Sequence, residues 1–241
     1  MTLHPKDQAA IDKAVDDLRQ IYAGRLLAVA LHGEAVGLDY KPRKSPLALA
    51  IVLTAVSADE LAAMHPHIKS WQRRRVVTPL VLDPRYIETS VDVFPLEFID
   101  LMDRHFLLHG KSDPFAGISI QPAHLRAQIE AQLRGKMLHL WEAFLASAGS
   151  PRAMRRVLLE TTPDFATALR GLLLLGEVQR PLEMLALLAA VESRFELNLE
   201  TFHALEKTRQ AGKPPANSEL ATLFTAYLDE VRGLVQLVDK L

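Results

Sequence analysis

The pattern of apolar and polar positions near the start of the chain predicts a helix followed by two strands. Over residues 6–22 the apolar positions recur at helical spacing, and Gly24 ends the segment. The runs 26–31 and 47–54 are short and almost wholly apolar, which is typical of buried strands. This order of elements predicts that the chain begins with a layered α/β structure.

The same reasoning predicts four further elements in this first part of the chain. We expect a helix that is capped by Ser57 and extends to Trp71, and a strand over 76–82 whose internal proline suits the edge of a sheet. A helix over 84–91 and a strand over 96–101 follow. Strands and helices therefore alternate, which supports a sheet with helices against it.

Beyond Gly117 the strand pattern disappears and helical periodicity takes its place. The predicted helices cover residues 122–148, 152–160, 164–178, 181–196, 199–210 and 217–241. We therefore predict an α+β chain with two domains. The first, over 1–117, is a mixed sheet with flanking helices, and the second, over 118–241, is an all-α helical bundle.

Composition and charge exclude several classes of function. The 241 residues carry a formal net charge of -1, with 49% hydrophobic residues and a mean hydropathy of +0.07. This charge argues against general binding to nucleic acid or to anionic membranes. The chain contains no cysteine, which excludes disulfides, thiolate catalysis and zinc-cysteine sites. Without a long apolar run, the sequence predicts a cytoplasmic protein with no membrane or nucleic acid partner.

One segment has the outline of a metal-dependent active site. Gly33-Glu34 follows the first predicted strand, and Ser45 leads the second, which begins Pro46-Leu47-Ala48. This arrangement resembles the signature of the nucleotidyltransferase superfamily, of the polymerase-beta-like, minimal nucleotidyltransferase and antibiotic adenylyltransferase types. In that family a Gly-Ser turn closes the first strand and the second carries Asp-x-Asp. Here Glu34 replaces the serine, and Pro46 and Ala48 occupy the two aspartate positions.

The resemblance implies what these replacements remove. In the family the aspartates hold two divalent cations that align a nucleoside triphosphate and neutralise developing charge. Proline and alanine offer no anionic oxygen to magnesium, and the carboxylate of Glu34 repels phosphate. We therefore predict a degenerate, catalytically inactive member that has no metal or cofactor and retains the fold to bind a small ligand or a protein partner.

The resemblance also leaves an active alternative open. A third acid on a neighbouring strand completes the family's site, and Glu97 and Asp92 are the candidates for this remnant acid. Relocated acids, namely Glu34, Asp39 and Glu97, are an alternative metal site. Such a site would bind a magnesium-nucleotide and transfer its adenylyl group to a small molecule or a protein.

Cations in the loop between the glycine turn and the second strand provide a further candidate. Lys41, Arg43 and Lys44 lie near where the triphosphate would bind, so that with Gly33, Glu34 and Ser45 they form the predicted cleft for phosphate. The alternative interpretation is a solvated loop. Arg73-Arg74-Arg75 is interpreted as a solvated surface, and His32 is either a ligand of the cleft or a core histidine.

A structural role is the third hypothesis. The apolar stripes of helices 122–148 and 217–241 are long enough to form an interface. The sequence therefore also allows a homodimer through the helical domain.

Overall fold

The structure is a computed structural model that describes residues 3–37 and 40–241. The chain is divided into two compact units, Met1–Ser119 and Ile120–Leu241. Among the described residues, no helix is both long enough and apolar enough to span a bilayer. One residue of the alternative metal site, Asp39, lies outside the described residues.

The first unit is built on a four-stranded mixed sheet in the order β3-β2-β1-β4. The strands are β1 (Leu26–His32), β2 (Ala48–Leu53), β3 (Leu80–Leu82) and β4 (His105–Gly110). The central strand β1 pairs antiparallel with both β2 and β4, and β2 pairs parallel with β3. The predicted α+β class with a mixed sheet is confirmed, and β3 lies at an edge as its neighbouring proline predicted.

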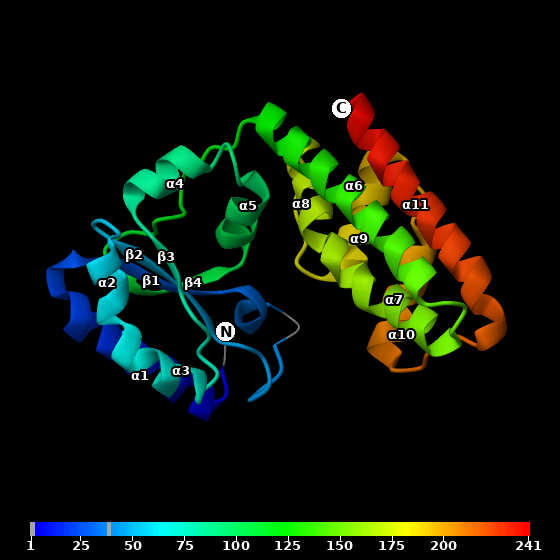
Figure 1. Ribbon diagram of the computed structural model, residues 1–241. Coiled ribbons are helices and arrows are strands. Elements are labelled where there is room, and N and C mark those ends of the chain that lie inside the picture. Colours follow the sequence, from blue (N-terminus) through cyan, green and yellow to red (C-terminus); the bar gives the residue numbers. More distant parts are fainter. Residues whose placement is uncertain (1–2, 38–39) are drawn as a thin grey trace. The chain divides into compact units, whose positions relative to one another are not determined.

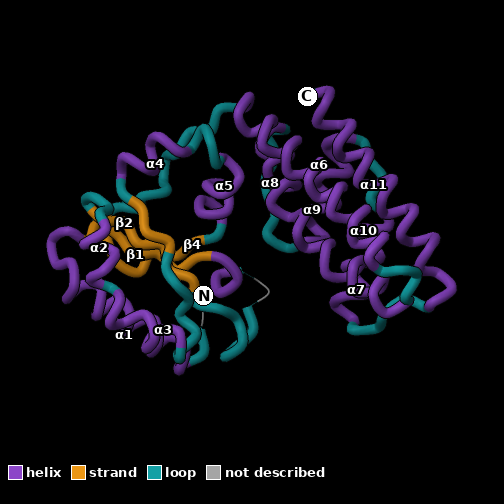
Figure 2. Tube along the Cα trace, in the orientation of Figure 1, coloured by secondary structure: helices purple, strands orange, loops and turns teal. Residues whose placement is uncertain are grey.

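One face of the sheet packs against α1 (Pro5–Tyr22) and α3 (His65–Gln72), which lie side by side in Figures 1 and 2. Alternate strand residues point to this face because the side-chain period of a strand is two. The buried core formed there includes Ile11, Ala14, Leu18, Val29, Leu31, Leu49, Ile51 and Trp71.

Two further helices, α4 (Pro84–Ser90) and α5 (Pro95–Asp103), lie on the other side of the strands (Figure 1). The Asp83 side chain caps α4 by accepting a hydrogen bond from the Tyr86 N–H at 2.7 Å. The strand residues between those of the first core, among them Ala28, Ala30 and Ala50, therefore belong to this second face.

The predicted strand over 96–101 was wrong, because these residues form α5. Their apolar positions fit a helical period as well as a strand, and Pro95 at the first helical position favours the helix. The fourth strand is instead β4, which begins at His105. Glu97 therefore lies in the first turn of a helix, and Asp92 lies in the turn between α4 and α5, so neither acid is on a strand.

Two other elements differ from the prediction in extent. The helix expected from Ser57 to Trp71 is divided into α2 (Ala58–Ala63) and α3, because Pro66 in the first turn of α3 has no N–H to continue the ladder. The predicted strand over 76–82 is reduced to β3, and Val76 makes only an isolated bridge with Leu47.

The second unit is all-helical, as predicted, and its helices form the bundle on the right of Figure 1. The long helices α6 and α11 pack together, with the Phe144 and Phe224 rings stacked at 4.3 Å between centroids. The helices are α6 (Pro122–Ala146), α7 (Pro151–Thr161), α8 (Ala166–Leu175), α9 (Met184–Phe195), α10 (Glu200–Ala211) and α11 (Leu220–Lys240).

An aromatic cluster forms the centre of this bundle. The rings of Phe165, Phe202 and Tyr227 are buried and contact one another, with centroids 4.7 to 6.0 Å apart. Next to them, the Glu230 carboxylate accepts hydrogen bonds from the Thr201 and Phe202 N–H groups and so caps the start of α10. Burial raises the pKa of Glu230, which these hydrogen bonds oppose.

Part of the apolar stripe on α6 is not covered. Leu125, Ile129 and Leu133 are buried, but Trp141 and Leu145 near the end of the helix are exposed. The homodimer predicted from this stripe stays a prediction, which the mass of the protein in solution tests.

Candidate functional site

The glycine turn closes β1 as the sequence predicted. Gly33 has a φ of 73°, a left-handed conformation that glycine adopts without a Cβ penalty, and it opens a short 3-10 turn, η2 (Gly33–Val36). Its N–H donates to the Arg104 carbonyl oxygen, which ties the turn to the segment before β4. The turn thus lies at the end of the central strand, next to both neighbouring strands.

The register places the two expected aspartate positions beside this turn. His32 pairs with Ala48 on one side and with His105 on the other, so that the three form one row across the sheet. Ala48 is half-buried, and Pro46 is exposed directly before β2. Cross-strand partners share a face, and this face is the one opposite α1 and α3.

This row lacks the chemistry of a metal site. Within residues 3–37 and 40–241, none of the four strands contains an aspartate or a glutamate. In the same described part of the chain, no group of three histidine, aspartate or glutamate side chains is placed to hold a metal ion. The sheet therefore presents small and imidazole side chains where carboxylates would be needed for magnesium.

Glu34 and Ser45 are brought into direct contact. The Ser45 hydroxyl donates to a Glu34 carboxylate oxygen at 2.5 Å and accepts a hydrogen bond from the Lys41 N–H at 2.8 Å. Ser45 is buried, whereas Glu34 is exposed at the turn. A carboxylate is therefore fixed in the predicted phosphate cleft, where it repels an anionic ligand.

The loop cations do not gather around Gly33 as one group. The Lys41, Arg43 and Lys44 side chains are exposed. The Arg43 N–H donates to Asp7 on α1, and Arg43 lines a separate cavity together with Arg73, Arg74 and Arg75. Lys41 is linked to Ser45 through its backbone, because its N–H donates to the Ser45 hydroxyl and its carbonyl oxygen accepts a hydrogen bond from the Ser45 N–H.

His32 is the one titratable side chain on β1, and its surroundings hold it neutral. Burial lowers the pKa of this imidazole, the Asp100 carboxylate raises it in part, and His105 lowers it further, so that the net pKa lies below its usual value. Asp100 on α5, rather than Glu97 or Asp92, is therefore the acid that acts on His32, and Asp113 lies 3.0 Å from His105 Nε2 in the same row. Periodicity did not identify Asp100, because the apolar positions of 96–101 also fit a strand.

We expect His32 to make the stability of the protein sensitive to acid. The unfolded chain binds this proton at a higher pH than the folded chain does. The contribution of His32 to stability is therefore complete above about pH 6.5 and is lost as the pH falls through the lowered pKa. In thermal unfolding followed by circular dichroism, His32→Gln is expected to lose less Tm between pH 7 and pH 5 than the wild type.

A control removes an exposed histidine from the other unit. His139→Gln is expected to lose as much Tm between these pH values as the wild type, because this side chain is largely exposed. Equal acid sensitivity of His32→Gln and the wild type would contradict a buried, neutral His32.

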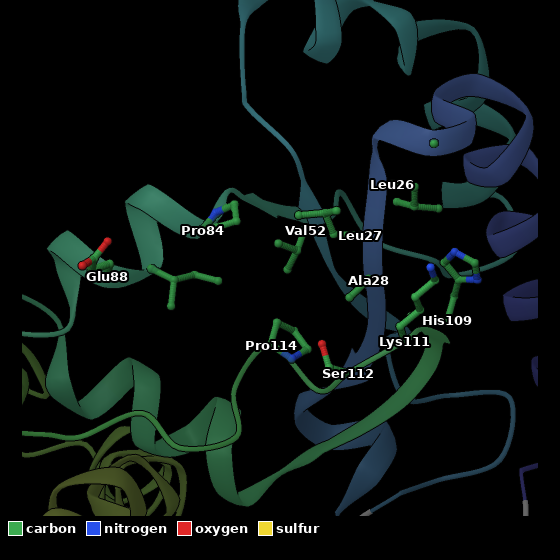
Figure 3. Close-up of a pocket in the computed structure, with 13 residues that line it drawn as sticks. Leu26, Leu27, Ala28, Val52, Pro84, Glu88, His109, Lys111, Ser112 and Pro114 are labelled. Atoms are coloured by element: carbon green, nitrogen blue, oxygen red, sulfur yellow. The ribbon is translucent and has the colours of Figure 1, made fainter.

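A cavity of the first unit lies at the other end of the sheet (Figure 3). It measures about 830 Å³ and is lined mainly by apolar groups. The Leu27 end of β1 is six residues from Gly33, which is about 20 Å at roughly 3.3 Å per residue. The polar groups that line the cavity come from Glu88, His109, Lys111 and Ser112. None of these residues was identified from the sequence.

Gly110 lines this cavity at a position where a side chain would come close to the backbone of β1. Gly110, at the end of β4, has a φ of 138°, and a Cβ there would lie 3.0 Å from the Leu27 carbonyl oxygen. Figure 3 shows Pro84 and Glu88 on α4, and Ser112 and Pro114 on the segment after β4. Apolar walls with a few polar groups are typical of small-molecule sites.

Comparison with known proteins gives little further information. No family model matches the chain, and no curated protein matches it. Among solved structures, it is similar to the spectinomycin adenyltransferase AAD(9) from Enterococcus faecialis, crystallised with ATP and spectinomycin. That match has 12% sequence identity and a TM-score of 0.45, and it covers 93% of this chain and 99% of the other. Similarity at this level supports no conclusion about fold or function.

Proposed function

We propose that this chain is a nucleotidyltransferase-like protein that does not catalyse nucleotidyl transfer and that uses its fold to bind a small ligand. The frame of the family's site is present, because β1, the left-handed Gly33 and β2 follow one another and the two strands are antiparallel neighbours. One observation carries the loss of activity: in the described part of the chain, no strand of the sheet bears a carboxylate.

The physical consequence is a large loss of rate. Metal assistance contributes several kcal/mol of transition-state stabilisation, and each ~1.4 kcal/mol corresponds to a factor of about ten. Pro46 and Ala48 supply none of it. In addition, the Glu34 carboxylate, held by Ser45, disfavours a triphosphate at the turn.

The position of Glu97 argues against the active alternative. It lies exposed in the first turn of α5 rather than on a strand beside Gly33. The alternative then depends on Glu34 and Asp39. The cavity of about 830 Å³ supports a small-molecule ligand, since its volume is in the usual range for such sites.

Pyrophosphate release from nucleoside triphosphates tests this proposal. We expect the wild type to release pyrophosphate from ATP at the rate of a protein-free control, with magnesium or manganese present. Glu34→Gln and Asp39→Asn are expected to leave that rate unchanged. Release above background that needs the metal and is lost in either variant would instead establish the active alternative.

A further inference from the structure

We propose that a second site in the first unit binds a compact polyanion, a small molecule that carries two or more phosphate groups. The site is a cavity of about 410 Å³, which we call the basic cavity. Its charged lining consists of Lys6, Asp7, Arg43, Arg73, Arg74 and Arg75.

The five cations come from three separate parts of the chain. Lys6 lies in the first turn of α1, Arg43 in the loop before β2, and the three consecutive arginines 73–75 directly after α3. From the sequence, Arg43 is a candidate for the phosphate cleft at Gly33 or part of a solvated loop, and the arginine run is interpreted as a solvated surface. The fold brings them to one concave surface.

A buried carboxylate holds these parts together. Asp7 is fully buried, and its Oδ2 accepts hydrogen bonds from the Tyr40 hydroxyl at 2.7 Å and from the Arg43 N–H at 2.9 Å. Its Oδ1 accepts a hydrogen bond from Arg75 Nη2. Asp7 belongs to α1 and accepts hydrogen bonds from the loop and from the arginine run. These three parts of the chain therefore keep one arrangement.

The charge of the basic cavity is strongly positive. Within the described ranges, Asp7 is its one acidic lining residue, and Arg75 already pairs with it. The side chains of Lys6, Arg43, Arg73 and Arg74 are exposed, and none of these four forms an ion pair with an acid in the described part of the chain. Four positive side chains therefore remain to attract an anion, in a protein whose overall net charge is -1.

Backbone conformation indicates that two of these cations are held in place. Arg43 and Arg75 have φ values of 60° and 65°, a left-handed conformation that is uncommon for residues other than glycine. The Arg75 carbonyl oxygen accepts a hydrogen bond from the Leu47 N–H at 2.9 Å, so its position is fixed by the strand that follows the loop. The backbone that carries these two residues therefore loses little entropy when a ligand binds.

The lining determines the chemical class of the ligand. Guanidinium groups bind phosphate through two parallel N–H donors, and the three lining arginines whose side chains do not pair with Asp7, namely Arg43, Arg73 and Arg74, offer such forks. The cavity is the size of a small-molecule site, and among the residues that the structure describes no aromatic side chain lines it on which a nucleic acid base would stack. Recognition through the phosphate groups of a small molecule is therefore favoured over binding of a nucleic acid.

This proposal is independent of the proposed loss of nucleotidyl transfer. Asp7 belongs to α1, which covers the face of the sheet opposite to the one that carries Ala48. Failure of one proposal would leave the other unaffected, since anion binding here needs no metal and no reaction.

Titration calorimetry with inorganic pyrophosphate tests the basic cavity. The titration is done at low ionic strength with EDTA, so that no divalent metal contributes. We expect saturable binding to the wild type, and an affinity about tenfold or more weaker in Arg73→Ala/Arg74→Ala. Arg75 is left unchanged because it pairs with Asp7. In Arg73→Lys/Arg74→Lys, which keeps the charge without the fork, we expect an intermediate affinity.

The control is a matched pair of arginines in the helical unit. Arg152 and Arg156 line a smaller surface pocket, and Arg152→Ala/Arg156→Ala removes the same charge. It is expected to keep the wild-type affinity, and circular dichroism verifies that all variants are folded. The absence of saturable binding to the wild type would overturn the proposal. Equal weakening in both alanine pairs, or tighter binding of single-stranded RNA that pyrophosphate does not displace, would also overturn it.

Discussion

Replacing Asp7 with asparagine is expected to destabilise the protein by about 3 kcal/mol, the lower end of the usual range for breaking a buried ion pair. All three partners of the Asp7 carboxylate are donors, namely Tyr40, the Arg43 N–H and Arg75. An asparagine has one acceptor oxygen, so its NH₂ group must face at least one of these donors. The free energy of unfolding from urea denaturation measures the effect.

An exposed aspartate on the same helix, Asp12, is the control for this prediction. The Asp12 carboxylate accepts a hydrogen bond from the Gln8 side chain at 2.8 Å, and Asp12→Asn is expected to change stability by less than about 0.5 kcal/mol. Similar stabilities of Asp7→Asn and Asp12→Asn would show that the Asp7 network does not hold the loop before β2.

The pH dependence of Asp7→Asn follows from the same contacts. Burial alone would raise the pKa of Asp7, but the hydrogen bonds from Tyr40 and Arg43 and the charge of Arg75 outweigh it, so the pKa is lowered. The stabilisation by Asp7 is therefore present above about pH 4 and is lost as the pH falls through the lowered pKa. The difference in stability between wild type and variant is expected to shrink in that acid range.

Introducing two carboxylates at the start of β2 is expected to create a metal site. The double variant Pro46→Asp/Ala48→Asp places two acids two residues apart, on one face of an extended segment beside His32. Carboxylate oxygens bind hard divalent cations, and an imidazole is a further ligand for manganese. We expect this variant to bind Mn²⁺ at least about tenfold more tightly than the wild type, a gain of ~1.4 kcal/mol. Electron paramagnetic resonance of free Mn²⁺ measures it.

The control is a variant that carries the two new acids at other positions of the chain. Pro42→Asp/Lys44→Asp adds two acids at the same spacing in the exposed loop, and it is expected to gain little affinity for Mn²⁺. If the two double variants, both folded, bind Mn²⁺ equally, residues 46 and 48 do not occupy the metal-binding positions of the family's site.

Most of the secondary structure could be predicted from periodicity, and the one wrong element shows the limit of that method. The helix over 6–22 and the strands over 26–31 and 47–54 have a single period that fits one structure. The apolar positions of residues 96–101 fit the period of a helix as well as that of a strand. Pro95, which occupies the first position of α5, favours the helix. The true fourth strand was missed because β4 contains two histidines and is only half-buried.

The candidate site was predicted in outline and not in its contacts. The Gly33 turn and the strand that follows it were predicted from the apolar runs, whereas the assignment of Pro46 and Ala48 to the aspartate positions rests on the resemblance and stays a prediction. The contact between Glu34 and Ser45 depends on the path of the loop between them, and spacing does not determine that path. The convergence of Arg43 with the arginine run depends on Asp7, a residue that appeared in the sequence only as one polar position of an amphipathic helix.

Titration calorimetry of the wild type with ATP, in magnesium and in EDTA, tests the missing metal site most directly. The same titrations of Arg73→Ala/Arg74→Ala distinguish ATP bound at the basic cavity from ATP bound near Gly33. We predict that magnesium does not tighten ATP binding to either protein, because Pro46 and Ala48 provide no ligand for the cation. Binding that requires magnesium and persists in Arg73→Ala/Arg74→Ala would contradict this account.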